Sequence, residues 1–88
     1  MNVKFRKSFR RDLKKVKDRA ILELVRQAIE QIESVTMLQG VTELKKISGS
    51  SDSYRIRVRD YRIGMVVEGD VVEFVRCLPR RDLYRFFP

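Results

Sequence analysis

The feature that most constrains the fold is a run of apolar residues spaced like one face of an α-helix. They stand at positions i, i+3, i+4, i+7, i+8 and i+11 and are Ile21, Leu24, Val25, Ala28, Ile29 and Ile32. This spacing is typical of an amphipathic helix that buries one face against a core. Asp18 stands just before the run as a candidate N-cap, and Gly40 marks the loop that follows it.

Shorter patterns predict a strand and a first helix ahead of this one. Residues 2–6 alternate apolar and polar side chains, as a short strand does. Ser8 is a candidate N-cap for a helix that runs to about Lys17. Its predicted inward face consists of Phe9, Leu13 and Val16, and its outward face of Arg10, Arg11, Lys14, Lys15 and Lys17.

After residue 43 the apolar period changes from that of a helix to that of a strand. A turn is predicted at Asp60, a second at Glu68–Asp70, and Pro79 is expected to end the last strand. The predicted strands cover residues 53–59, 61–68 and 71–77, and a short C-terminal helix or tail covers residues 80–87. Residues 44–47 are a candidate for a further short strand, which is not counted in the order below.

The order of these elements is β-α-α-β-β-β, which indicates an α+β fold. Two consecutive helices do not form a repeated βαβ array, so we expect both to cover one face of a mainly antiparallel sheet. The opposite face would then meet solvent or a partner. With 88 residues, we expect one domain that spans residues 1–88.

Composition excludes several kinds of chemistry. The chain has no His and one Cys. A zinc site of His and Cys, a Ser-His-Asp triad and a Cys-His pair are therefore ruled out. The lone Cys77 has no partner for a disulfide within the chain. We expect neither a metal nor a cofactor.

The positive charge is concentrated at the two ends of the chain. The formal charge is +8, and residues 1–20 hold nine basic side chains against two acidic ones. Residues 54–88 hold eight basic side chains, all of them Arg, against five acidic ones. The planar guanidinium of Arg binds phosphate at two points. A solubilising surface is one interpretation, but this pattern favours a polyanionic partner.

We expect neither a signal peptide nor a membrane-spanning segment. Residues 1–7 lack the apolar core of a signal peptide, and no apolar run approaches the ~20 residues that span a membrane. A lone Cys in a Val-rich segment fits a reducing compartment. We therefore expect a cytoplasmic protein.

Strict alternation predicts a strand with one apolar side and one side made of arginines. Arg55, Arg57 and Arg59 share that second side. Arg62 on the next strand is expected to face outward at the same surface. Like charges this close repel each other unless an anion binds between them. The alternative is that each Arg pairs with an acid, for which the candidates are Asp60, Glu68 and Glu73.

Tyr84 is the aromatic residue of most interest, because it lies in the basic C-terminal segment. It is a candidate base-stacking platform or proton-transfer group. The competing interpretation is a tyrosine packed in the core.

Four short motifs occur in a suggestive order. They are Leu44–Gly49 (LKKISG), Tyr54–Val58 (YRIRV), Asp60–Ile63 (DYRI) and Pro79–Arg85 (PRRDLYR). With this order and spacing, nearly the whole chain resembles the RelE/ParE superfamily of toxins from type II toxin–antitoxin pairs.

The resemblance implies a ribosome-dependent endoribonuclease of the bacterial or archaeal cytoplasm. It would contact 16S rRNA, cleave mRNA in the ribosomal A site through the 2′-hydroxyl, and be held in check by an acidic antitoxin. The catalytic residues carried over are Arg55, Arg57, Arg62, Arg80, Arg81 and Tyr84. We expect further RNA contacts from Arg59, Arg85, Lys14 and Lys15. Because an arginine stays protonated, it does not serve as general base, and the base is left unassigned.

Two other functions fit the same fold. One is a ParE-like toxin that inhibits DNA gyrase by binding and has no nuclease activity. The other is an RNA-binding module whose arginine face only positions phosphates. Fold alone does not choose between these functions.

Overall fold

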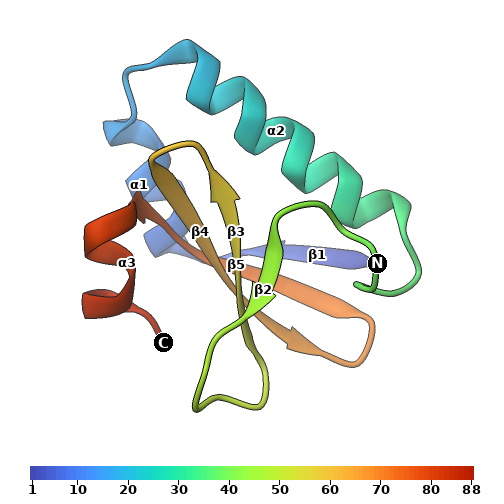
Figure 1. Cartoon of the computed structure of the whole chain (residues 1–88). Helices are drawn as coiled ribbons and strands as arrows, with labels where there is room; N and C mark the ends of the chain where they lie inside the picture. The colour runs from blue at the N-terminus through green and yellow to red at the C-terminus, as the bar shows by residue number, and fades with distance from the viewer.

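The computed structural model describes all residues from Met1 to Pro88. The elements in order are β1 (Asn2–Phe5), α1 (Lys7–Lys15), α2 (Arg19–Ser34), β2 (Leu44–Lys46), β3 (Ser53–Val58), β4 (Tyr61–Glu68), β5 (Val71–Pro79) and α3 (Arg80–Phe86). The strands form one sheet in the order β1-β5-β4-β3-β2 (Figure 1). Only β1 and β5 run parallel. The α+β fold and the mainly antiparallel sheet are therefore confirmed.

The amphipathic helix predicted from the apolar run is α2. Asp18 is its N-cap, and the Asp18 carboxylate accepts a hydrogen bond from the Ala20 amide at 2.8 Å. Its inward residues join those of α1 and of one sheet face in the main core. The most deeply buried members of that core include Phe9, Ile21, Val25, Ile32, Ile63, Met65, Val72 and Phe74.

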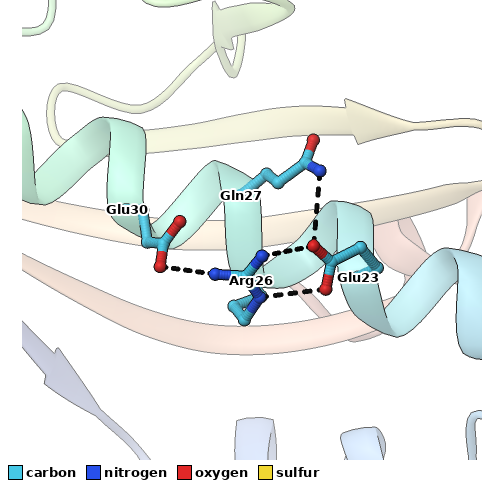
Figure 2. A network of polar contacts seen from close by, with 4 residues as sticks. All are labelled: Glu23, Arg26, Gln27 and Glu30. Carbon is cyan, nitrogen blue, oxygen red and sulfur yellow. Dashed lines mark hydrogen bonds and ion pairs between the residues drawn. The ribbon is translucent and has the colours of Figure 1, made fainter.

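The outward face of α2 carries a network of exposed charges. Figure 2 shows Arg26 between Glu23 and Glu30, with the Gln27 amide donating to Glu23 at 3.4 Å. Hydrogen bonds to Arg26 lower the pKa of Glu23, and the same pair raises the pKa of Arg26. Networks this exposed add little to stability. They do make this side of the molecule chemically unlike the arginine-bearing sheet face.

The first helix begins earlier than the sequence predicted, and Ser8 is not its N-cap. Arg6 occupies the N-cap position without a side-chain cap, so Ser8 lies inside the first turn. The Ser8 hydroxyl donates instead to the Val75 carbonyl at 2.5 Å. Because β1 pairs with β5 only as far as Phe74, the edge of β5 beyond that residue has no strand neighbour. Side chains of α1 supply hydrogen bonds there in place of a strand.

The second sheet face is not left open, which corrects the expectation of a bare arginine face. The C-terminal helix α3 packs on it beside β4 and β5 (Figure 1). A small core of Ile47, Val75, Leu83 and Phe87 holds the helix there. A Cβ atom at position 64 would lie 2.6 Å from the Phe87 ring, so Gly64 lets that ring approach the strand. The arginine face is thus bounded by α3.

Two-residue turns join β3 to β4 and β4 to β5. Val58 pairs with Tyr61, so Arg59 lies in the first turn with φ 55° and not on the strand as predicted. Gly69 holds the matching position of the second turn with φ 58°. A positive φ strains any residue except Gly, so the Arg59 position is unusual.

No helix is both long enough and apolar enough to cross a membrane.

Candidate functional site

Residues from β3, β4, their connecting turn and α3 surround a hollow of about 610 Å³. We call it the arginine hollow. Its seven lining residues are Arg55, Arg57, Arg59, Asp60, Arg62, Arg80 and Tyr84. Five of these side chains are arginines and one is an acid, so the hollow carries a large excess of positive charge.

Strand register explains why the arginines converge. Arg57 and Arg62 lie directly opposite each other in the antiparallel pair, a position in which side chains share a face and lie close together. Arg55 is opposite Gly64 on one side and Lys45 on the other. Lys45 therefore extends the positive row onto β2. No local sequence pattern predicts that Lys45 joins this row, because its location depends on the pairing of β2 with β3.

Arg62 is buried, which corrects the expectation that it faces outward. Only 7% of its surface is exposed. One guanidinium nitrogen donates to the carbonyls of Arg59 and Tyr61 at 2.7 and 2.8 Å, and no carboxylate pairs with the group. Burial lowers the pKa of Arg62, and the positive charges around the hollow lower it further. A buried cation without a counterion is a favourable place for an external anion.

The acid that partly offsets the arginines comes from the loop before β2. Glu43 pairs with Arg57 at 3.4 Å, and its carbonyl accepts from Arg55 at 3.0 Å. None of the three acids proposed from the sequence plays this part. Glu73 pairs with Arg6 on the opposite edge of the sheet at 2.6 Å, and neither Asp60 nor Glu68 forms an ion pair.

The start of α3 forms the remaining wall. The Arg80 amide donates to the Asp60 carbonyl at 2.8 Å and ties the helix to the β3–β4 turn. Tyr84, one turn later, borders the hollow and is 58% exposed. This exposure overturns the alternative that Tyr84 packs in the core. Its ring therefore has open surface beside the arginines.

Four residues predicted to act with this group lie outside it. Arg81 borders a different depression with Tyr61 and Pro79. Arg85 approaches Asp82 at 3.9 Å and lies over the Phe86 ring at 5.5 Å. Lys14 and Lys15 are exposed in the last turn of α1 and do not line the hollow.

An ion pair between α1 and β5 has almost no signature in the sequence. Asp12 on α1 is 4% exposed and accepts two hydrogen bonds from Arg76, at 2.8 and 3.1 Å. It also accepts the Cys77 amide at 3.0 Å, which satisfies the open edge of β5. These bonds raise the pKa of Arg76. Burial, helped by the Asp12 charge, raises the pKa of the Cys77 thiol to about 12. The only sequence signal was one acid within a basic helix.

The chemistry available in the arginine hollow is anion binding with charge stabilisation. Guanidinium groups on three sides offer many N–H donors and no acceptor. Such donors suit a phosphate diester and the extra negative charge that develops on it during cleavage. The exposed Tyr84 ring next to them offers an aromatic surface, which is the kind of surface on which nucleic-acid bases stack.

Comparisons with known proteins agree with this assembly of strands and arginines. A family model described as the ParE toxin of the type II toxin–antitoxin system parDE matches residues 3–84. A curated protein, toxin RelE3 of Methanocaldococcus jannaschii, is 40% identical over 89 residues that cover 100% of both chains.

Solved structures have the same fold. The RelB–RelE antitoxin–toxin complex from Methanococcus jannaschii contains a chain that is 39% identical, with a TM-score of 0.81 over 97% of this chain and 99% of that one. The archaeal RelE–RelB complex from Pyrococcus horikoshii contains a chain that is 23% identical, with a TM-score of 0.72 over 90% and 93%. The latter likeness shows the fold alone.

Proposed function

Because this chain belongs to the ParE/RelE family of type II toxins, as a toxin of the RelE type, we propose that it is an endoribonuclease that cleaves mRNA in the ribosomal A site. The reaction would take place in the cytoplasm, where ribosomes are found. Family membership alone does not assign this reaction to the arginine hollow.

The observation that carries the proposal is the placement of Arg62. This guanidinium is buried, lines the hollow and has no carboxylate partner. Arg55 and Arg57 border the same space from β3. A polynucleotide phosphate would supply the missing negative charge. Because extra charge builds up on phosphorus in the transition state, the same arginines would favour cleavage over mere binding.

Five of the seven lining residues have a distinct part in the proposed reaction. The 2′-hydroxyl of the RNA attacks the adjacent phosphorus and yields a 2′,3′-cyclic phosphate and a 5′-hydroxyl. Arg55, Arg57 and Arg62 stabilise the pentacoordinate phosphorus. Arg80 stabilises the leaving 5′-oxygen, and we prefer it to Arg81 because only Arg80 lines the hollow. Tyr84 stacks on a base and orients the phosphate.

The ribosome is proposed to supply the order that so open a hollow lacks. Holding the reacting groups in one geometry removes a large part of the barrier. Lys14, Lys15 and Arg85 are exposed cations outside the hollow, and we propose that they and Arg59 contact RNA, including 16S rRNA. The hollow itself has one metal-ligating side chain, Asp60, which supports a reaction without a metal.

The protein partner is proposed to be an acidic antitoxin. Two of the relatives were solved as complexes of RelE with RelB, and an acidic chain complements the formal charge of +8. Co-expression with the neighbouring open reading frame should give a complex that survives gel filtration and relieves toxicity. Failure of that frame to do either would remove this partner.

Toeprinting of an mRNA in a translation reaction with the purified protein tests the nuclease proposal. We expect a new cut within the A-site codon, and an mRNA with a 2′-deoxy sugar at that position should resist it. A protein that binds programmed ribosomes without cutting them would instead be an RNA-binding module.

A ParE-like gyrase inhibitor is the second candidate, because the matching family model is the ParE toxin of parDE. It predicts loss of supercoiling by DNA gyrase and an intact mRNA. The arginine hollow favours the nuclease, since inhibition by binding does not require a buried arginine without a counterion.

A further inference from the structure

The arginine hollow contains no obvious acceptor for the proton that the 2′-hydroxyl must lose. Guanidinium groups are donors only, and five of them line the space. Asp60 is the one carboxylate among the lining residues. An ionised carboxylate accepts hydrogen bonds and protons, so it has the property that every arginine lacks.

We propose that Asp60 is the general base of the cleavage reaction. This inference rests on the proposed nuclease function and adds to it the group that starts the chemistry. Asp60 removes the proton from the 2′-hydroxyl while the 2′-oxygen forms its bond to phosphorus. The bond from phosphorus to the 5′-oxygen then breaks, and that oxygen takes a proton from water. The proton on Asp60 returns to the hydroxide left behind, so charge and atoms balance.

The backbone that carries Asp60 is held from both sides of the hollow. Arg62 donates to the carbonyls on either side of Asp60, those of Arg59 and Tyr61, at 2.7 and 2.8 Å. The Arg80 amide donates to the Asp60 carbonyl itself at 2.8 Å. Three consecutive carbonyls are therefore fixed by residues that also line the hollow. These bonds fix the backbone that carries the Asp60 side chain and so limit the positions that its carboxylate can take.

The turn is also strained in a way that favours function over stability. Arg59 adopts φ 55°, although Gly suits that conformation best and Gly69 fills the matching position in the β4–β5 turn. Strain of this kind is concentrated at functional sites, where surrounding structure maintains it. In the Arg59–Asp60 turn, Arg59 occupies the position that Gly would fill with less strain, and Arg59 borders the hollow.

The aspartate of the other turn shows what a structural role looks like. Asp70 follows Gly69 as Asp60 follows Arg59. Its carboxylate accepts the Asn2 side-chain amide at 3.0 Å, and its carbonyl accepts the Asn2 backbone amide at 2.9 Å. The Asp60 carboxylate makes no hydrogen bond or ion pair within the chain. It is thus free to accept a proton from substrate.

Asp60 borders two depressions that carry charged and titratable residues. Those of the hollow are Arg55, Arg57, Arg59, Arg62, Arg80 and Tyr84, and Glu43 pairs with Arg57 beside them. The second depression adds Tyr61 and Arg81. A bound phosphate lies among the same arginines and competes with Asp60 for their charge. The pH dependence of cleavage therefore reports on this whole group, and only a variant at Asp60 isolates the carboxylate.

The test is the single-turnover cleavage rate on programmed ribosomes, measured across pH for wild type, Asp60→Asn and Asp70→Asn. Asn fits the same turn and cannot accept the proton. We expect Asp60→Asn to cleave about 10²–10⁴-fold more slowly than wild type. Its rate should also no longer decrease at acid pH. Asp70→Asn should match wild type in both. Asp60→Glu, which keeps a carboxylate, should recover part of the rate and the acid limb.

Three results would overturn the assignment. They are a rate for Asp60→Asn within about threefold of wild type, a faster rate, and a slower rate that still falls at acid pH as wild type does. If Asp60→Asn unfolds at a lower temperature than Asp70→Asn, the Asp60→Glu profile decides instead. Absence of cleavage by wild type would remove the nuclease proposal itself, whereas equal cleavage by wild type and Asp60→Asn removes only the base.

Discussion

Arg62 and Arg76 lie on neighbouring strands and on the same face of the sheet, yet their surroundings are opposite. Arg76 makes two hydrogen bonds to the buried Asp12, and its pKa is raised. Arg62 is bonded only to backbone carbonyls, and its pKa is lowered. The first arginine holds α1 to β5. The second has no counterion within the chain.

The burial of a charged side chain therefore does not by itself indicate what that side chain does. A buried pair in good geometry is costly to break, because removing one partner leaves the other uncompensated. A buried charge that never had a partner weakens the fold and is therefore a better indicator of a binding site. Variants at these two places should separate stability from activity.

The largest expected effect is on stability, at the paired arginine. Asp12→Ala leaves Arg76 without its carboxylate and the Cys77 amide without an acceptor. We expect the free energy of unfolding to fall by about 3–5 kcal/mol. Urea denaturation followed by circular dichroism measures it. Glu23→Ala, in the exposed network on α2, is the control and should change little. Equal losses in the two variants would contradict the prediction.

At the unpaired arginine, the main effect should be on activity. Arg62→Met keeps an apolar stem and removes a donor to the transition state. We expect cleavage on programmed ribosomes to slow about 10²–10³-fold, or roughly 3–4 kcal/mol. The loss of two hydrogen bonds to carbonyls is offset by removal of the uncompensated charge, so unfolding should shift by no more than about 1.5 kcal/mol. Normal cleavage by a folded Arg62→Met would exclude the role.

Arg62 and Arg76 each have an aromatic neighbour on α3, and we expect the two rings to differ in their effect on cleavage. Tyr84 borders the arginine hollow, whereas Phe86 lies beside Arg76 at 5.6 Å. Tyr84→Ala should slow cleavage by up to about 100-fold, the 1–3 kcal/mol of a lost base stack. Tyr84→Phe keeps the ring and should retain most of the rate. Phe86→Ala should leave cleavage unchanged.

A drop beyond about 100-fold in single-turnover rate for Tyr84→Phe, with mRNA binding intact, would show instead that the phenol transfers a proton.

The smallest expected effect concerns the strained turn beside Arg62. Arg59→Gly relieves a positive φ but adds freedom to the unfolded chain. We expect a net gain of about 0.5–1 kcal/mol in the free energy of unfolding, together with slower cleavage. Gly69→Ala imposes the opposite change on the matching turn and should destabilise by a similar amount. A less stable Arg59→Gly would show that the arginine side chain supports the turn.

Local patterns predicted the elements well, because their causes are local. The apolar period of α2, the Asp18 cap and the glycine turn at Gly69 each depend on a few adjacent residues. The alternation in β3 likewise predicted that Arg55 and Arg57 share a face. One hairpin was then enough to bring Arg62 to them.

What the sequence did not predict depends on contacts between distant parts of the chain. Asp12 and Arg76 are 64 residues apart, and no local pattern links them. Ser8 resembled an N-cap because its actual partner, the Val75 carbonyl, is also far away along the chain and leaves no local signal. Arg80 and Tyr84 reach the hollow beside Arg62 only after α3 docks through Leu83 and Phe87. The sequence of a short C-terminal helix does not indicate which face of the sheet the helix will cover.

The position of β5 affects the order in which the sheet can form. β5 lies between β1 and β4 in the sheet, although it follows both in the chain. Asn2 pairs with Val71 in the register. The N-terminal strand therefore stays unpaired until most of the chain has been synthesised.

The helix that brings Arg80 and Tyr84 to the hollow is made later still. A nascent chain that ends at β4 already contains the strand arginines but has no wall to face them. The arginine hollow is therefore one of the last parts of the molecule to form, because a ribosome synthesises almost all of the chain before the residues that complete the site are made.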